Sequence, residues 1–202
     1  MSIDLLEVNG VKCASVSSGI KSNNSLDLSL ISLVKGSNTA AVFTQNVFCA
    51  APVLVAKNHI DFNIEALLIN SGNANAGTGK KGLEGCYKSC EILAKELGIK
   101  PEQVLPFSTG VIGQSLPIAP FEKNANKLVS SLRQDGLSDV ARGILTTDLV
   151  EKSCSVSFEV DGQKVHLSGI AKGSGMIRPD MATMLSLSLI HISEPTRRYA
   201  IS

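Results

Sequence analysis

The sequence has few aromatic residues and no tryptophan. Aromatic side chains make up 4% of the 202 residues, so a core must be built from Val, Ile, Leu and Ala, within the 44% of residues that are hydrophobic. Charge of one sign is also lacking, because the formal net charge is +1 and the lysines are scattered. This balance offers no basic field for nucleic acid or anionic lipid, and it favours small molecules or other subunits as partners.

Long apolar runs are missing as well. The most apolar window, residues 40–56, is interrupted by "TQN" and by Pro52, and it falls short of the ~20 residues that a membrane helix needs. We expect buried strands in this window and no membrane partner. Asp4 and Glu7 stand where a signal peptide would carry positive charge, so we expect a cytoplasmic protein.

Cysteine and histidine are too few and too dispersed to indicate a metal site. The five cysteines are odd in number and lack a secreted-framework spacing, which indicates reduced thiols. Cys86 and Cys90 could share a metal from one helix, but no matching pair lies nearby, so buried hydrophobic roles are favoured and no metal is expected. His59, His166 and His191 have no nearby partners for a Ser-His-Asp arrangement.

Hydrophobic periodicity predicts one mixed α/β domain, with no internal repeat. The alternation around "DG" predicts a hairpin with one buried face, and Gly98 is expected to end a helix. In chain order, the expected segments are several strands within residues 8–55, a buried strand over 65–70, a helix over 82–97, a strand within 104–117, a helix over 121–132 and a hairpin over 155–167.

Three glycine-rich turns, "NSGNANAGTG", "STGVIG" and "KGSGM", could place chemistry in loops. Glycines expose backbone N–H groups and allow a ligand to approach, which suits phosphate or oxyanion binding. None of the turns matches a dinucleotide fingerprint or a P-loop, and ordinary tight turns are the alternative.

The pair Ala182-Thr183 offers a nucleophile. A threonine at a chain N-terminus carries its own base, because a free α-amino group has a pKa of about 7.7 to 8.0. The hydroxyl can create that terminus by attacking the preceding carbonyl of a strained backbone, which gives an ester that water opens. From the residues alone, an ordinary start of a helix or strand is the favoured interpretation.

The stretch "KGSGMIRPDMATML" resembles the cleavage and nucleophile motif of the ArgJ family, the glutamate N-acetyltransferases or ornithine acetyltransferases of arginine biosynthesis. Four further blocks match that family in the same order: "AVFTQNVFCAAPV", "ALLINSGNANAGTG", "LPFSTGVIG" and "ILTTDLVEK". The resemblance covers residues 20–185. One departure is Gly77, where members often have Cys, and we expect no loss of chemistry from it.

The resemblance implies an α/β (α+β) fold, a mixed-sheet αββα-type sandwich of the DmpA/ornithine acetyltransferase superfamily, incomplete in this chain. It implies that the precursor cleaves itself between Ala182 and Thr183. Thr183 then takes the acetyl group from N2-acetylornithine and passes it to glutamate, by a ping-pong route through an acetyl-enzyme.

The resemblance also implies roles for four further residues. Thr109 and Gly110 match the positions that hold the oxyanion, by a hydroxyl and by a backbone N–H. Thr146 and Lys172, together with the nucleophile, match positions that contact substrate. No cofactor is implied, and acetyl-CoA would be a second substrate if the enzyme is bifunctional.

The resemblance divides the chain into an α chain, residues 1–182, and the start of a β chain, residues 183–186. In the family the β chain is about as long as the α chain, and the two assemble, so a heterotetramer is expected. "LSLIHISEPTR" resembles the translation of a sequencing adapter, so we expect residues 187–202 to be a non-native tail; an ordinary solvated tail is the alternative.

Two other functions stay open. A related self-cleaving aminopeptidase would share the architecture and the terminal nucleophile, but it would hydrolyse its acyl-enzyme with water. The second is a non-catalytic fragment, because a chain that lacks most of the β chain is expected to expose apolar strand faces and to be inactive.

Overall fold

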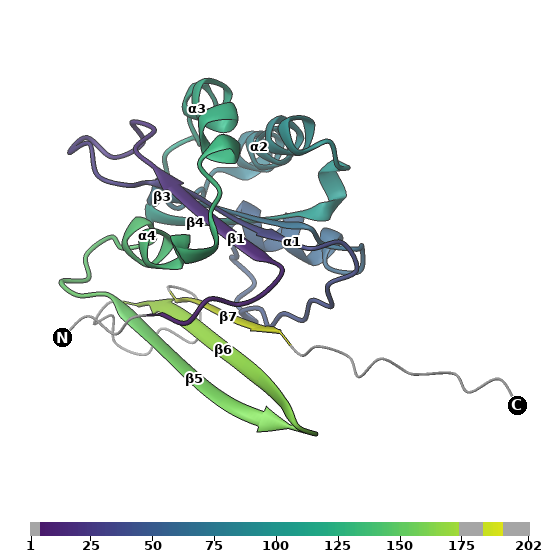
Figure 1. Ribbon diagram of the computed structural model, residues 1–202. Helices are drawn as coiled ribbons and strands as arrows, with labels where there is room; N and C mark the ends of the chain where they lie inside the picture. Colours follow the sequence, from purple (N-terminus) through teal and green to yellow (C-terminus); the bar gives the residue numbers. More distant parts are fainter. Residues whose placement is uncertain (1–4, 174–183, 192–202) are drawn as a thin grey trace, which may run out of the picture.

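Two β-sheets stack face to face, and helices cover the far side of the larger sheet (Figure 1). The computed structural model describes residues 5–173 and 184–191. The strands are β1 (Val11–Val16), β2 (Leu28–Leu33), β3 (Ala66–Asn73), β4 (Val104–Val111), β5 (Lys152–Val160), β6 (Gln163–Lys172) and β7 (Leu185–His191). The helices are α1 (Ala51–His59), α2 (Gly79–Leu97), α3 (Ala119–Ser130) and α4 (Leu137–Gly143), with 3-10 turns at Pro101–Gln103 and Gln134–Gly136.

The larger sheet has the strand order β1-β2-β3-β4. Its first three strands are antiparallel, whereas β3 and β4 are parallel. A parallel pair needs a long crossover, which α2 supplies. The carboxyl ends of β3 and β4 therefore meet at one edge of the sheet. The smaller sheet is antiparallel, in the order β5-β6-β7.

One face of the larger sheet packs against α1, α2 and α3. Leu30 and Leu68 on the strands meet Leu93 of α2 and Leu128 of α3 in one buried cluster. Cys86 and Cys90 belong to the same cluster, which confirms that they are packed as small buried hydrophobic residues. The expected helices over residues 82–97 and 121–132 are confirmed, and Gly98 ends α2 in the left-handed conformation with φ +69°.

The other face of the larger sheet packs against α4 and the smaller sheet. Leu67 and Leu105 share a buried cluster with Ile170 of β6 and with Leu187 and Leu189 of β7. The layers are thus helix, sheet, sheet, as expected for an incomplete αββα sandwich. No described helix covers the outer face of the smaller sheet.

That outer face carries exposed apolar side chains, as expected, although Val165 of β6, which pairs with Phe158, is buried. Val156, Phe158 and Val160 of β5 are 41–46% exposed, and Ile190 of β7 is 48% exposed. The hairpin of β5 and β6 is confirmed, with its turn at Asp161 (φ +50°) and Gly162 (φ +74°). The prediction that one face of this hairpin is buried is wrong for β5, where only inward-facing Ser153 and Ser155 are partly buried.

Strand β7 lies where the sequence suggested a tail. Leu187 and Leu189 are buried while Ser186 and Ser188 are exposed, so an ordinary solvated tail is wrong for residues 187–191. Alternating Leu and Ser suffices to make a half-buried strand whatever the origin of the segment. That residues 187–202 are non-native therefore stays a prediction.

The expectation of buried strands over residues 40–56 is wrong. Residues 40–50 form neither helix nor strand, and Val47 is fully exposed, while residues 51–59 form helix α1. Pro52 lies in the first turn of α1, where its fixed φ suits a helix and its missing N–H costs nothing. No described helix is long and apolar enough to cross a membrane.

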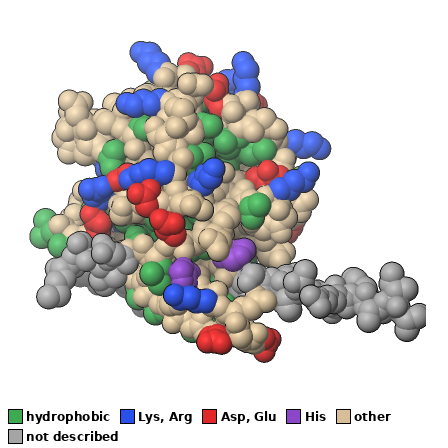
Figure 2. Space-filling view, in the orientation of Figure 1, with side chains coloured by type: hydrophobic (Ala, Val, Ile, Leu, Met, Phe, Trp, Pro, Cys, Tyr) green, Lys and Arg blue, Asp and Glu red, His purple; other side chains and the backbone are tan. Residues whose placement is uncertain are grey.

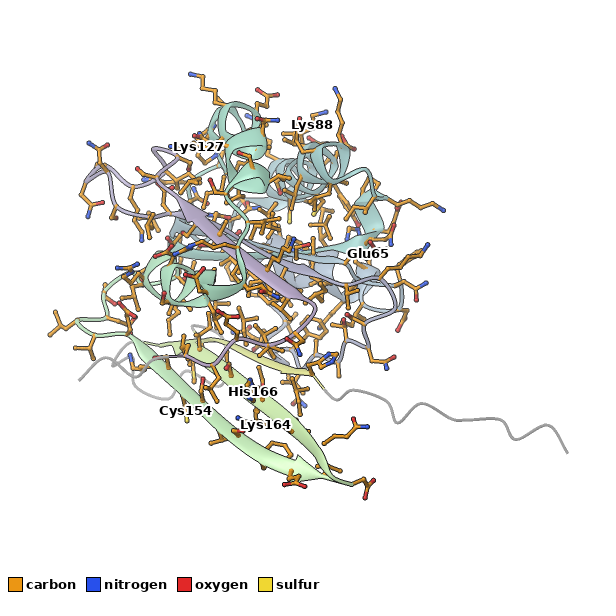
Figure 3. All side chains as sticks on the ribbon, in the orientation of Figure 1. Glu65, Lys88, Lys127, Cys154, Lys164 and His166 are labelled. Carbon is orange, nitrogen blue, oxygen red and sulfur yellow. The ribbon has the colours of Figure 1, made fainter. Side chains whose placement is uncertain are left out.

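The cysteines differ sharply in burial. Cys13, Cys86 and Cys90 are buried, whereas Cys154 on β5 is exposed (Figure 3). Burial raises the pKa of Cys13 from 9.0 to about 12, although Arg133 acts to lower it. A hydrogen bond with Cys86, together with burial, raises the pKa of Cys90 well above 9.0. Buried thiols with a raised pKa are poor nucleophiles.

We expect Cys154 to react first when the native chain is treated with a maleimide at pH 8. Cys13, Cys86 and Cys90 should stay unmodified until the chain unfolds, because they are buried. Peptide mapping by mass spectrometry at successive times measures the order, and a urea-unfolded sample is the control for intrinsic reactivity. Labelling of Cys13 as fast as Cys154 would contradict this packing.

Candidate active site

The carboxyl ends of β3 and β4 bring Thr109 and Gly110 to one edge of the larger sheet. The parallel register pairs Ser71 with Thr109 and Gly72 with Gly110. Thr109 is only 7% exposed, whereas Gly110 lies open at the strand end. The structure therefore places the two expected oxyanion residues at an accessible edge, next to each other.

Gly110 is held in a conformation that side chains rarely adopt. Its φ is +133°, and a Cβ built on it would lie 2.4 Å from the carbonyl carbon of Gly72. Only glycine fits so close an approach of two backbones. Glycine is needed here for both conformational and steric reasons. Because glycine has no side chain, the backbone at the strand end stays uncovered.

The stretch "SGNANAGTG", which begins in the last three residues of β3, is held by asparagine side chains. The Asn70 amide donates to the Asn73 carbonyl at 2.8 Å, and the backbone N–H of Asn75 donates to the Asn73 side chain at 2.8 Å. The Asn75 amide donates to the Gly82 carbonyl at 2.9 Å. These buried side chains bond to two backbone carbonyls and one backbone N–H, which supports a structural role for the turn.

Thr146 and Lys172 are in direct contact. The ammonium of Lys172, the last residue of β6, donates to the Thr146 hydroxyl at 3.1 Å, and Lys172 is only 4% exposed. Burial lowers the pKa of Lys172; the charge of Asp148 opposes this shift, and that of Lys152 adds to it. A buried ammonium beside a hydroxyl is suited to binding a carboxylate.

Asp148 is the acidic group of this site, and sequence reasoning missed it although it lies in the block "ILTTDLVEK". Its side chain is 1% exposed and forms an ion pair with Lys152. The backbone N–H of Gly173 donates to Oδ1 at 3.4 Å, while Oδ2 is buried with no hydrogen-bond partner among the described residues. Burial acts to raise the pKa of Asp148, but hydrogen bonds from Lys152 and Gly173 and the charges of Lys152 and Lys172 outweigh it and lower the pKa.

A hydrogen bond links the strand edge to the segment that leads to Thr146. The hydroxyl of Ser71, which pairs with Thr109, donates to the carbonyl of Gly143 at the end of α4. Three residues later the chain reaches Thr146. The two expected pairs thus belong to one connected region of the molecule.

The described chain stops and resumes beside Lys172. Gly173 is the last residue described before the gap, and a Cβ built on it would lie 3.1 Å from Cγ of Met184, the first residue after it. Leu185 pairs with Lys172 in the sheet. Ala182 and Thr183, the expected cleavage pair, lie outside the described residues.

No group of three or more His, Cys, Asp or Glu side chains that could hold a metal occurs in the described part of the chain. Two histidines have backbone partners instead: Nδ1 of His59 lies 2.8 Å from the Val104 carbonyl, and Nδ1 of His166 lies 2.9 Å from the Glu7 carbonyl. On the face shown in Figure 2, acidic and basic side chains are interspersed. The chemistry of this region therefore rests on hydroxyl, backbone and lysine groups and on the carboxylate of Asp148.

We expect Gly110→Ala to destabilise the chain by about 3 kcal/mol or more, because the new Cβ meets the Gly72 backbone. Gly113→Ala is the matched control. Gly113 has φ +80°, but a Cβ there would meet no atom within 4 Å, so only about 1 to 2 kcal/mol should be lost. Urea unfolding measures both, and equal losses would show that the strands do not approach this closely.

We expect Asp148→Asn to lower the free energy of unfolding at pH 7 by about 1 kcal/mol. The loss is small because Lys152 is half exposed, so solvent screens its ion pair with Asp148. The pKa of Asp148 is lowered in the folded chain, so its stabilisation is present above the ordinary value of 3.8 and is lost as the pH falls through the lowered pKa. Urea unfolding at pH 7 and in steps below pH 4 should show the two proteins converging. The exposed Asp61→Asn controls for charge, and a difference independent of pH would refute the role of the carboxylate.

The sequence model of the ArgJ family matches residues 12–195. The chain is 46% identical over 184 residues to the arginine biosynthesis bifunctional protein ArgJ of Methylococcus capsulatus, which covers 91% of this chain and 45% of that protein. It is 44% identical over 178 residues to the ArgJ protein of Pseudomonas syringae pv. tomato, which covers 88% of this chain and 44% of that protein. The chain therefore spans about half the length of these curated relatives.

Two solved structures share the fold. The crystal structure of the arginine biosynthesis bifunctional protein ArgJ from Bacillus halodurans has a TM-score of 0.81 at 33% identity, covering 92% of this chain and 97% of that chain. Ornithine acetyltransferase from Mycobacterium tuberculosis, solved with ornithine, has a TM-score of 0.75 at 30% identity, covering 85% of this chain and 92% of that chain. The family resemblance of the sequence is thereby confirmed, and the chain belongs to the ArgJ family.

Proposed function

We propose that this chain is part of a glutamate N-acetyltransferase, which moves an acetyl group from N2-acetylornithine to glutamate in the cytoplasm during arginine biosynthesis. The observation that carries the proposal is the Thr146–Lys172 pair, because the segment containing Ala182-Thr183 begins and ends beside it. Both curated relatives carry the ArgJ name, and the Mycobacterium tuberculosis relative was solved with ornithine.

Thr183 would become the nucleophile after cleavage. Its hydroxyl attacks the carbonyl of Ala182, the peptide bond rearranges to an ester, and water opens the ester to leave Thr183 with a free amino group. That amino group, whose usual pKa is about 7.7 to 8.0, can then take the proton of the hydroxyl at neutral pH. The nucleophile therefore needs no histidine base.

The transfer would proceed in two halves. Thr183 Oγ attacks the acetyl carbonyl of N2-acetylornithine, and the tetrahedral oxyanion is held by the Thr109 hydroxyl and the Gly110 N–H. Collapse breaks the C–N bond, and the leaving amine takes a proton as ornithine departs. The amino group of glutamate then attacks the acetyl ester, and Thr183 Oγ regains a proton as N-acetylglutamate forms. Loss of one oxyanion donor typically costs about 10²- to 10³-fold in rate.

Lys172 would bind the carboxylate that both substrates carry. N2-acetylornithine and glutamate each have an α-carboxylate, so one buried ammonium can hold donor and acceptor in turn. Thr146, which accepts a hydrogen bond from Lys172, keeps the ammonium in place when no carboxylate is bound. A single binding site used twice agrees with a ping-pong order.

A second acetyl donor is also supported. Both curated relatives are named bifunctional, which favours acetyl-CoA as an alternative donor to the same nucleophile. No bound cofactor is needed for either donor. Acetyl-CoA would serve as a substrate, releasing its thiol when Thr183 is acetylated.

The assembly remains part of the proposal. We propose residues 1–182 as an α chain and residues 183–186 as the start of a β chain, the two assembling as a heterotetramer in the complete protein. Residues 187–202 are proposed to be non-native, and the 202-residue chain is proposed to be inactive alone. The open apolar face on β5 and β7 supports a missing covering layer.

The test uses the gene expressed with the genomic DNA downstream of codon 184. Mass spectrometry should find two chains, the second beginning at Thr183, and N2-acetylornithine labelled in its acetyl group should label that chain covalently. Thr183→Ala should abolish both cleavage and labelling, while Thr147→Ala, at an exposed neighbour of Thr146, should leave both intact.

The effect of added glutamate distinguishes the acetyltransferase from the self-cleaving aminopeptidase. Adding glutamate should discharge the label as N-acetylglutamate, whereas release as acetate with no effect of glutamate would indicate the self-cleaving aminopeptidase. An uncut protein with full acetyl transfer would overturn the proposed nucleophile. Activity of the soluble 202-residue chain alone would overturn the proposal that it is an inactive fragment.

A further inference from the structure

Lys21 is a partly buried lysine whose ammonium donates to three backbone carbonyls. Nζ lies 2.8 Å from the carbonyl oxygen of Leu145, 2.9 Å from that of Leu26 and 3.4 Å from that of Gly143. Gly143 and Leu145 lie at the carboxyl end of α4 and just beyond it, where helix carbonyls lack intrahelical partners and carry partial negative charge. The ammonium thus replaces the missing hydrogen-bond donors.

The backbone of Lys21 is itself held in place. Its N–H donates to Oδ2 of Asp27 at 2.8 Å, and the N–H of Ser18 donates to Oδ1 of the same carboxylate at 2.7 Å. Asp27 is fully buried. Burial lowers the pKa of Lys21; the charge of Asp27 opposes that shift, while the charge of Lys172 adds to it. The backbone of Lys21 is therefore held in place by the buried carboxylate of Asp27.

The stem of Lys21 lies against the strand edge that carries the expected oxyanion residues. A Cβ built on Gly72 would lie 3.0 Å from Cγ of Lys21, and Gly72 is the residue that pairs with Gly110. Lys21 consequently contacts both parts of the site: its stem meets the β3 end beside Gly110, and its ammonium meets the chain just before Thr146.

The contact with Leu145 bears directly on Thr146. The Leu145 carbonyl and the Thr146 N–H belong to one planar peptide group, so fixing the oxygen also fixes the plane from which Thr146 extends. Gly143 already has close neighbours, because a Cβ there would lie 2.4 Å from the hydroxyl oxygens of Ser15 and Ser29. Leu145 is therefore the position at which the ammonium of Lys21 matters most.

We propose that Lys21 is a positioning residue, which sets the distance between the Thr109–Gly110 strand edge and the Thr146–Lys172 pair. The inference rests on the proposed function, because this distance matters when one substrate must reach both pairs at once. Misplacement of a bound substrate by about 1 Å can cost about 10²-fold in rate. Lys21 acts through Leu145 and Gly72, and it need not touch substrate.

The test compares Lys21→Met with Lys21→Arg in the complete, cleaved enzyme. Methionine keeps an unbranched apolar stem but cannot donate, so kcat for acetyl transfer from N2-acetylornithine should fall about 10- to 100-fold, with a smaller change in KM. Arginine keeps donors and charge, and it should restore at least part of kcat. Lys12→Met, which removes an exposed lysine of β1, is the matched control and should match the wild type.

The rate must be expressed per working active site, because a loss of folded protein would imitate a loss of kcat. Covalent acetyl labelling counts the sites. A Lys21→Met enzyme with fewer labelled sites but a normal kcat per site would show that Lys21 only stabilises the fold, and it would overturn the proposal. A normal kcat with normal labelling would overturn it as well.

Hydrogen exchange separates this inference from the proposed function. In Lys21→Met, amides of residues 144–148 should exchange faster, while those of β2 should be unchanged. If the wild-type enzyme transfers no acetyl group, the proposed function fails, and exchange alone decides whether Lys21 fixes this segment. Unchanged exchange at residues 144–148 would refute the positioning role whatever the activity.

Discussion

The contact between the backbones of Gly72 and Gly110 is the constraint on which the rest of the site depends. Parallel pairing of β3 with β4 brings these glycines together, and a Cβ on Gly110 would lie within 2.4 Å of the Gly72 backbone. Because neither glycine carries a side chain, the backbone at Gly110 stays exposed and the stem of Lys21 packs against Gly72. The hydroxyl of Ser71 and the ammonium of Lys21 then extend the same edge to the carboxyl end of α4.

Positive charge is concentrated at this edge although the chain as a whole is nearly neutral. Burial lowers the pKa of both Lys21 and Lys172; the charge of Lys172 adds to the shift at Lys21, and the charge of Lys152 adds to the shift at Lys172. Asp148 is the carboxylate that faces Lys152 and Lys172. A local excess of ammonium groups favours an anionic ligand. Backbone carbonyls accept hydrogen bonds from Lys21, and the Thr146 hydroxyl accepts one from Lys172.

The sequence predicted the elements whose periodicity is long or regular. Helix α2 and the hairpin of β5 and β6 fall into this class, whereas α1 was missed because the run "APVLVA" is apolar on every side and does not distinguish strand from helix. Thr109, Gly110, Thr146 and Lys172 came from family resemblance, since nothing in their spacing separates them from ordinary turn residues. Lys21 could not be found, because its Leu145 contact joins residues 124 positions apart.

The pairing of β6 with β7 has a consequence for what a broken peptide bond would do to the molecule. All seven residues of β7 pair with β6, and Leu187 and Leu189 are buried against the larger sheet. A chain opened anywhere between residues 173 and 184 would keep these hydrogen bonds and this apolar contact. The two pieces would stay bound as a noncovalent complex, because such a scission would not release β7 from β6.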